Sequence, residues 1–281
     1  MHAESSEGAS AGVVKPFQFD DGKLPSLPNA VIYLEKAMQD DSISLHRLAE
    51  LLSNDPVLAA RLVRVANSAY YRGVSPVENV PEAVSRIGFS ATRNLALVLL
   101  QNSFKARHEV VASMIGDLWM QSVRTAAVAS AFSRHYQLVD ANRAMLGGLM
   151  YNVGAMLLLT RIDEKVDNIS QEIVELLLAK HSCQFGVNLL KHWEMDPELV
   201  QVVANRDNWQ RSHAESPDLA DLILVARCCT TGADGTPPDL EYCEALPAYA
   251  CIQQFLNLSE PLSSVVEAAE ESIARTLEML A

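Results

Sequence analysis

The sequence predicts an all-α protein, and three observations predict it. Helix-start signals and apolar residues at helical spacing recur along most of the 281 residues. Polar and apolar residues nowhere alternate over a stretch long enough to indicate a strand. Hydrophobic residues make up 49% and charged residues 20% of the chain, which is typical of a folded protein and not of a disordered one.

The N-terminal part begins with a segment that lacks core residues. Residues 1–23 mix Ser, Gly, Ala and acidic residues, and we expect them to form a flexible leader. The prolines in residues 24–28 predict a turn, because a proline disfavours helix at the residue before it. Helical spacing then predicts a helix over residues 29–39, and a cap at Ser44 predicts one that runs to Leu52.

Later helices are predicted mainly from their start signals. In Asn54-Asp55-Pro56 an aspartate precedes a proline at the first helical position, where the missing N–H is harmless. Asp196-Pro197 and Ser216-Pro217-Asp218 repeat this signal, and Ser90 and Asp140 are further caps. Helical spacing predicts helices over residues 91–107, 110–137, 141–160, 170–192, 197–209, 217–231 and 261–280. Pro237-Pro238 predicts a loop.

Charge divides the chain. The net charge is −13, but residues 46–108 carry 8 basic and 4 acidic side chains, whereas residues 109–281 carry 11 basic and 24 acidic ones. We therefore predict a basic N-terminal helical subdomain over residues 24–108 and a second helical subdomain over residues 109–281.

The basic block has two interpretations. One is an ordinary solvated helix surface. The other is a docking face for an acidic partner, for the acidic half of the chain or for a phosphate-bearing ligand, with Arg61, Arg64, Arg72 and Arg93 as its candidate residues.

Composition excludes several classes of protein. No run of apolar residues approaches the 18 or more of a transmembrane helix, and the N-terminus lacks the basic and apolar regions of a secretion signal, so we expect a cytoplasmic protein without a membrane span. The five cysteines are odd in number and include no C-x-x-C, which favours free thiols. The strongly negative net charge argues against nucleic-acid binding through the four candidate arginines.

Common catalytic signatures are also absent from the sequence. It contains no phosphate-binding glycine loop, no H-E-x-x-H and no G-x-S-x-G. None of the seven histidines is followed by aspartate. His181 and Cys183 are two residues apart, so on a helix they face different directions and make a poor metal pair.

Ordered motifs nevertheless resemble one bacterial family, the HDOD domain (HD-related output domain), over roughly residues 20–210. The motifs are Leu24–Pro28, Ala49–Ser68, Val80–Phe89 with Arg93-Asn94-Leu95, Leu118–Ser122, Leu146–Gly154 and Gly186–Pro197. The resemblance implies a multi-helix bundle like that of the HD superfamily of metal-dependent phosphohydrolases. It also implies a role in bacterial signal transduction.

In active HD enzymes, histidines and a His-Asp pair hold divalent metals. By motif, the first histidine position falls on Gln121 or Ser122, and the His-Asp pair falls on Tyr151-Asn152. A later histidine position falls near Ser182, and a final His-His pair falls on Asn205-Arg206. None of these side chains offers the imidazole or carboxylate that such metals need, so we expect no metal, no cofactor and no catalysis.

Two classes of function follow from the resemblance. The first is a non-catalytic regulatory module that binds a protein partner. Its degenerate pocket could also bind a nucleotide or cyclic dinucleotide, with Arg206 as the anchor for a phosphate group, or could simply be filled by side chains. The alternative is a metal-dependent phosphohydrolase that takes ligands from elsewhere, such as His181, Asp117 or Asp207.

Overall fold

The computed structural model describes residues 24, 49, 52–53, 56–68, 71, 73–89, 91–92, 95, 104, 106–165, 170–213, 216–230, 239–264, 266–267, 270–271 and 274. Every regular element among them is a helix, which confirms the all-α prediction. The helices are α3 (Pro56–Ala66), α4 (Val80–Ile87), α6 (Glu109–Tyr136), α7 (Ala141–Met150), α8 (Val153–Lys165), α9 (Gln171–His192), α10 (Pro197–Ala204), α11 (Leu219–Cys228), α12 (Leu240–Glu244) and α13 (Pro247–Leu256).

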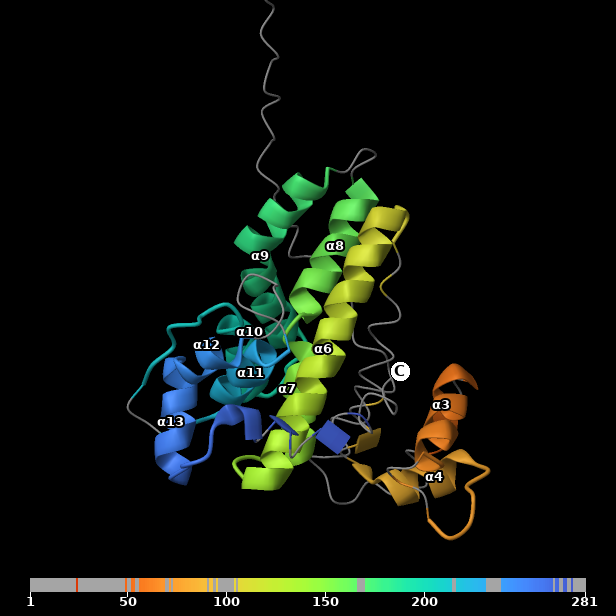
Figure 1. The fold of residues 1–281 in the computed structure, drawn as a ribbon. Helices are drawn as coiled ribbons and strands as arrows, with labels where there is room; N and C mark the ends of the chain where they lie inside the picture. Colours follow the sequence, from red (N-terminus) through yellow and green to blue (C-terminus); the bar gives the residue numbers. More distant parts are fainter. Residues whose placement is uncertain are drawn as a thin grey trace, which may run out of the picture.

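The N-terminal helices α3 and α4 pack against each other and lie on one side of α6 (Figure 1). The loop between them is held by Asn67, whose amide donates to Val77 O (2.7 Å) and whose Oδ1 accepts from Val77 N (2.8 Å). Asn79 caps α4 by accepting from Glu82 N. The predicted division into residues 24–108 and 109–281 stays a prediction.

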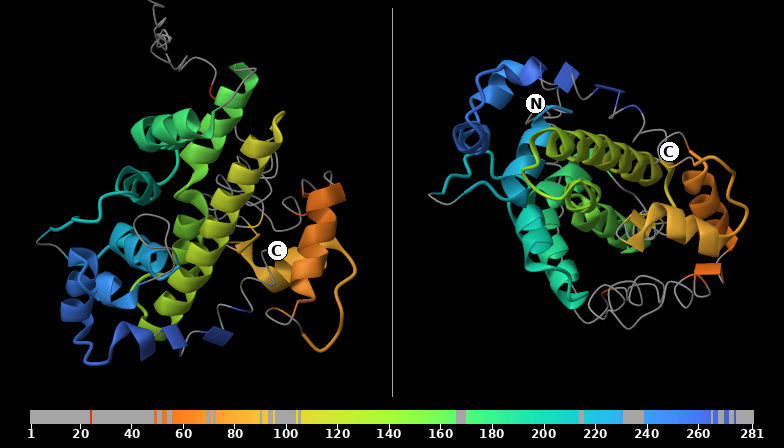
Figure 2. Two further views of the ribbon diagram at one scale, coloured as in Figure 1. Left: turned by 45° about the horizontal axis from the view of Figure 1, so that its top comes forward. Right: turned by 90° about the horizontal axis from the view of Figure 1, so that it is seen from below.

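The core of the molecule is built around α6, which packs along α7 and also contacts α8 and α11. On the side of α6 away from α3 and α4 lie α9 to α13 (Figures 1 and 2). Glycines allow the closest contacts. A Cβ on Gly148 of α7 would lie 2.4 Å from Ala126 Cα of α6, and one on Gly154 of α8 would lie 2.5 Å from Gly186 Cα of α9.

The segment predicted as one helix over residues 141–160 is two helices. Tyr151 and Asn152 form a turn between α7 and α8. The interruption is slight, because Tyr151 N still donates to Gly147 O and Met156 N still donates to Asn152 O, and the donor–acceptor distance is 3.1 Å in each bond. Both turn side chains are fully buried in the core.

The start of α6 is fixed by a carboxylate from α8. Asp163 is 1% exposed and accepts hydrogen bonds from the backbone N–H groups of Arg107 and His108 (3.1 Å for the latter). Its Oδ1 also lies 2.7 Å from His108 Nδ1. A residue 55 positions away therefore caps α6, whereas its own N-cap residue, His108, makes no side-chain cap bond.

Several predicted helix boundaries were wrong. Phe104 and Ala106 are not helical, so the helix predicted over residues 91–107 ends earlier. The predicted helix over 197–209 ends at Ala204, and the one over 217–231 starts at Leu219 because Asp218, and not Ser216, is its cap. Asp140 and Asp196 cap α7 and α10 as expected. The sequence did not predict α12 and α13.

Other predictions fall on residues that the structure does not describe. These are the leader over residues 1–23, the helix over 29–39, the caps at Ser44, Asp55 and Ser90, the Pro237-Pro238 loop, and most of the helix predicted over 261–280.

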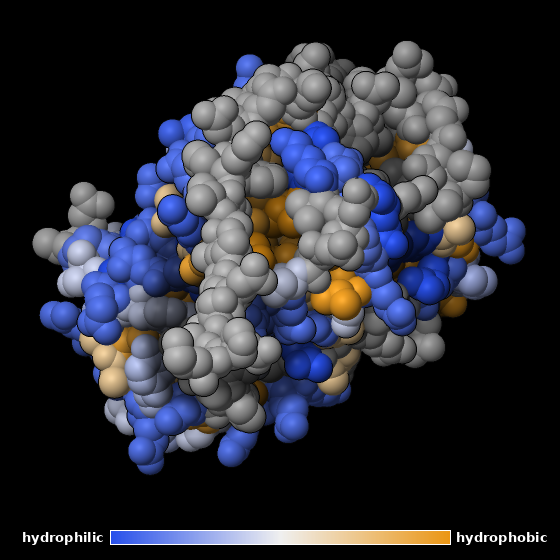
Figure 3. All heavy atoms as spheres, turned by 90° about the horizontal axis from the view of Figure 1, so that it is seen from above, coloured by the Kyte–Doolittle hydropathy of each residue, from blue (hydrophilic) through white to orange (hydrophobic). Residues whose placement is uncertain are grey.

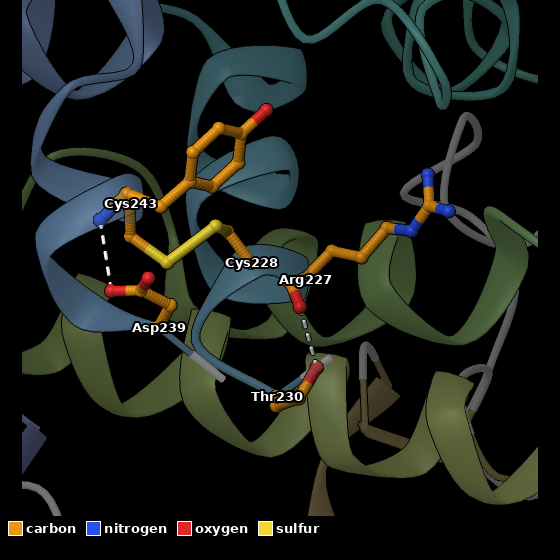
Figure 4. The surroundings of a disulfide bond; sticks show 6 residues. Arg227, Cys228, Thr230, Asp239 and Cys243 are labelled. Atoms are coloured by element: carbon orange, nitrogen blue, oxygen red, sulfur yellow. Dashed lines mark hydrogen bonds between the residues drawn. A yellow bond between two sulfur atoms is a disulfide. The ribbon is translucent and has the colours of Figure 1, made fainter. Parts of the chain in front are cut away.

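The expectation of five free thiols was wrong. Cys228 at the end of α11 and Cys243 in α12 form a disulfide, with a Cα–Cα distance of 5.7 Å (Figure 4). The two cysteines are 15 residues apart in sequence, so only the packing of α12 on α11 brings them together. Cys183, Cys229 and Cys251 are free.

The run from Ala141 to Lys165, which comprises α7, the Tyr151-Asn152 turn and α8, is long and apolar enough to cross a membrane, and it is the one such run among the described residues. However, 89% of its apolar window is buried inside the fold, as in the central helix of a folded domain. Hydrophilic residues dominate the described surface seen from above, with hydrophobic residues visible toward its middle (Figure 3).

Candidate functional site

The candidate site is centred on the ring of Tyr151, in the turn between α7 and α8. Two guanidinium groups lie beside this ring. The Cζ atom of Arg206, just after α10, is 5.8 Å from the ring centroid, and that of Arg227, on α11, is 5.5 Å away. Arg227 also lies 4.8 Å from the ring centroid of Trp209. The site thus combines two cations with two aromatic rings, an arrangement that stabilises guanidinium groups.

A single carboxylate joins the two arginines. Asp207 Oδ2 accepts from Arg206 Nε (3.0 Å), and Asp207 Oδ1 accepts from Arg227 Nη1 (2.9 Å). The side chains of Arg206 and Arg227 are only 10% and 13% exposed, whereas that of Asp207 is 49% exposed. Arg227 Nη1 also donates to the backbone oxygen of Arg206, which fixes its position.

Burial and neighbouring charges perturb these groups. Burial lowers the pKa of Arg206; Asp207 opposes this shift, and Arg227 adds to it. Burial alone would raise the pKa of Asp207, but the two arginines outweigh it and hold that pKa below its usual value. Asp207 is therefore a carboxylate at neutral pH, and the three side chains together carry one net positive charge.

Some buried polar atoms of the site lack a hydrogen-bond partner among the described residues. They are Arg206 Nη1, Tyr151 Oη and Asn152 Oδ1. Such atoms are uncommon in folded proteins, because an unpaired buried polar atom costs free energy. They mark the site as polar and incompletely satisfied.

The structure brings together most, but not all, of the predicted pocket residues. Ser122 Oγ and Asn152 Nδ2 both donate to Leu118 O, at distances of 3.0 and 3.3 Å. Gln121 is partly exposed on the same turn of α6 as Ser122. Asn205, in contrast, follows α10 and donates to Gln201 of that helix.

The residues of this site do not fit a divalent cation. Metals such as iron, manganese and zinc take imidazole or carboxylate ligands, and two guanidinium groups would repel them. The three ligands considered for a metal-dependent enzyme are not gathered either. Asp117 is exposed on α6, Asp207 is paired with the arginines, and none of the three belongs to a potential metal-binding group among the described residues.

A different trio could offer metal ligands. Atoms of His213, Asp221 and Cys251 lie within 4.8 Å of one another, a grouping that the sequence analysis did not predict. Arg211 already occupies this place: it donates to Asp221 and its Nη1 lies 2.7 Å from His213 Nε2. Burial, and next the charge of Asp221, raise the pKa of the Cys251 thiol, the opposite of what a nucleophilic thiol needs.

Of the candidate docking residues, the structure describes Arg61 and Arg64. Arg64 is exposed, but Arg61 is partly buried, and its burial lowers its pKa, with a further contribution from Arg64. Arg72 and Arg93 lie outside the described residues.

Sequence reasoning found Tyr151 and Arg206 but missed Arg227 and Trp209. Arg227 belongs to the region for which the sequence offered no motif. The only sequence signal was an arginine on the apolar stretch Leu222–Ala226, where a charge needs a partner.

Comparison with known proteins gives a consistent result. The family described as the HDOD domain matches residues 24–209. A protein from Treponema pallidum, named as uncharacterized, is 21% identical over 270 residues, which are 88% of this chain and 50% of the relative. The chain therefore spans about half the length of that relative.

Solved structures share the fold. A protein from Shewanella amazonensis, named as a candidate metal-dependent phosphohydrolase, has a TM-score of 0.75 and 23% identity over 92% of this chain and 93% of its own. An HDOD domain protein with unknown function from Geobacter sulfurreducens has a TM-score of 0.67 and 19% identity over 92% of each chain. A candidate signal transduction protein from Marinobacter aquaeolei has a TM-score of 0.63 and 23% identity over 92% of this chain and 60% of its own. At these identities the likeness shows the fold alone.

Proposed function

The chain belongs to the HDOD domain family, and we propose that it is a non-catalytic regulatory module of bacterial signal transduction that acts by binding a protein partner. One observation carries the proposal. At the place where an HD enzyme would hold its metal with a His-Asp pair, this chain has Tyr151 and Asn152, and Tyr151 packs against the guanidinium groups of Arg206 and Arg227.

The chemical consequence is large. A metal in such a site lowers the pKa of bound water to about 7, so without it the hydroxide nucleophile is roughly 10⁸-fold scarcer at neutral pH. Phosphate-ester hydrolysis is among the slowest uncatalysed reactions. The arginines could stabilise a phosphate group, but the site offers no group positioned to generate the nucleophile.

The role of a partner-binding module is supported by the family and by the charge distribution. The basic block over residues 46–108 is suited to an acidic protein surface. The relative from Marinobacter aquaeolei is named as a candidate signal transduction protein. Since the chain carries no metal-ligating set at the family position, regulation through binding is the function that remains compatible with these residues.

Metal analysis combined with phosphatase assays tests the proposal. We expect purified protein, loaded in turn with iron, manganese and zinc and then desalted, to retain far less than one metal per chain. We also expect no turnover of p-nitrophenyl phosphate, mononucleotides or cyclic dinucleotides above the metal-only background. Stoichiometric metal together with turnover would instead support the alternative, a metal-dependent phosphohydrolase.

A further inference from the structure

Two nearly buried guanidinium groups, those of Arg206 and Arg227, share one anion position, which the carboxylate of Asp207 occupies. Burying charge is costly unless it is paired, so two buried cations favour an anion between them, and an anion of larger charge can take the same position. The site therefore has an electrostatic preference for anions.

We propose that Arg206 and Arg227 bind the phosphate group of a small phosphate ester, and that Asp207 occupies this anion position when the ester is absent. The inference rests on the proposed function, because a site without a metal would bind the ester and leave it intact.

The geometry around Asp207 supports this assignment. Its two carboxylate oxygens each accept from a different guanidinium group, over 3.0 and 2.9 Å. A phosphate monoester can make the same two contacts with two of its oxygens, and it has a third oxygen and a larger negative charge. Guanidinium groups pair well with phosphate oxygens.

Additional donors are buried in the same cluster. Arg206 Nη1 has no hydrogen-bond partner among the described residues, although the Arg206 side chain is nine-tenths buried. The hydroxyl of Tyr151, whose ring lies next to both arginines, is also without one among those residues. The site therefore contains buried donors that Asp207 does not use.

Exchange of the carboxylate for a phosphate is structurally feasible. Asp207 lies in the turn that follows α10, outside any helix, and its side chain is about half exposed. It can therefore swing toward solvent without breaking helical hydrogen bonds. In contrast, Arg227 is anchored on α11 and by its bond to the backbone oxygen of Arg206, so the cationic part of the site is preformed.

Asp207→Asn is the sharpest test, because the two explanations of this carboxylate predict opposite results. If it occupies an anion position, its removal should tighten phosphate binding by about five-fold, the factor that corresponds to losing a competing ion pair of about 1 kcal/mol. If it is only a structural ion pair, its removal should lower stability and create no phosphate dependence.

The measurement is isothermal titration and thermal unfolding with inorganic phosphate and with AMP, in sodium chloride of matched ionic strength. We expect both ligands to raise the unfolding temperature of the wild-type protein, and to raise that of Asp207→Asn by more. Tighter binding of AMP than of inorganic phosphate would identify a nucleotide as the source of the phosphate group, and equal binding would identify free phosphate. A cyclic dinucleotide, which has no terminal phosphate, should bind more weakly than AMP.

Glu198→Gln is the matched control. It removes a carboxylate that is 53% exposed and lies away from the site, where Glu198 Oε2 pairs with Arg143 Nη2 at a distance of 2.6 Å. This variant should bind phosphate as the wild-type protein does. Arg206→Lys and Arg227→Lys, which keep the charge but lose the forked donor geometry, should bind phosphate at least about five-fold more weakly while remaining folded by circular dichroism.

Phosphate-independent stability of both the wild-type protein and Asp207→Asn would overturn this inference and leave the non-catalytic assignment standing. Turnover of the ester in a metal-dependent manner would overturn the proposed function instead, so the two failures can be distinguished.

Discussion

Asp163 shows how one buried side chain can fix the start of a long helix. The N-terminus of a helix leaves backbone N–H groups without partners, and it favours negative charge. Asp163 supplies both acceptors and charge there, through its bonds to the backbone of Arg107 and His108. Burial alone would raise the pKa of Asp163, but these hydrogen bonds and the contact with His108 outweigh it and lower that pKa.

This pKa shift predicts a pH dependence of stability. A carboxyl group whose pKa is lower in the folded state contributes stability above its unfolded pKa of about 3.9, and the contribution disappears as the pH falls through the folded value. We expect Asp163→Asn to lower the free energy of unfolding by about 2 kcal/mol at pH 7, the cost of losing hydrogen bonds to a charged acceptor.

Urea unfolding at a series of pH values checks this prediction. The two proteins compared are the one with Asp163 and the Asp163→Asn variant, and both also carry His108→Gln so that no imidazole titrates beside the carboxyl group. The difference between the two proteins should be constant down to about pH 4 and then shrink. Asp117→Asn, an exposed position on α6, should change little at any pH. A difference that grows toward acid would contradict this account.

At the scale of helices, the packing depends on glycines at contact points. The helix pairs α6–α7 and α8–α9 approach so closely at Gly148 and Gly154 that a side-chain carbon would overlap backbone atoms of the neighbouring helix. Backbone atoms cannot rotate aside as a side chain can, so the helices themselves would have to separate. The glycines thus set the distance between the helices that place Tyr151.

We predict that Gly154→Ala destabilises the protein by about 3 kcal/mol or more, because the new Cβ would lie 2.5 Å from backbone atoms of Gly186 and Ser182. The control is Gly116→Ala, at an exposed position of α6 where nothing lies within 4 Å of the new carbon. That change should stabilise the protein by about 1 kcal/mol through helix propensity. Chemical unfolding of both variants measures the contrast, and equal effects would disprove it.

The disulfide between Cys228 and Cys243 ties α12 to α11 immediately after Arg227 (Figure 4). In the chain-entropy description, a crosslink closing a loop of about 15 residues stabilises the folded state by about 3 kcal/mol. We expect reduction by dithiothreitol, or the double change to alanine, to lower the free energy of unfolding by an amount of this order.

Mass spectrometry first establishes the bond itself. Alkylation of the unfolded, unreduced protein should modify Cys183, Cys229 and Cys251 only, and prior reduction should expose all five cysteines. Five modifications without reduction would show that the crosslink does not form.

For the molecule as a whole, the uneven charge is the property that bears most directly on binding. A net charge of −13 keeps the surface acidic, and the basic block over residues 46–108 stands out against it. Of the two candidate docking residues that the structure describes, Arg64 is the one suited to a test, because reversing the charge of the partly buried Arg61 would destabilise the fold as well as change binding.

We therefore predict that Arg64→Glu weakens binding of an acidic protein partner, with wild-type helicity by circular dichroism. The measurement is the salt concentration at which captured partner elutes from the immobilised chain, since electrostatic contacts weaken with ionic strength. Lys191→Glu, an exposed charge reversal on α9, should elute as the wild-type protein does. If the partner elutes from both variants at the same salt concentration, the interface does not include Arg64.

The sequence by itself determined the all-α class and the caps at Asp140 and Asp196, and its motifs singled out Tyr151 and Arg206 as candidate site residues. These features are local: a cap or a motif is a property of neighbouring residues, and neighbours in sequence stay neighbours in the fold. Only the tertiary structure decided that Arg227 joins Arg206 over the ring of Tyr151, that Asp163 caps α6 and that Cys228 pairs with Cys243. Each of these contacts joins residues on separate segments, and their meeting depends on how helices pack, which no local pattern records.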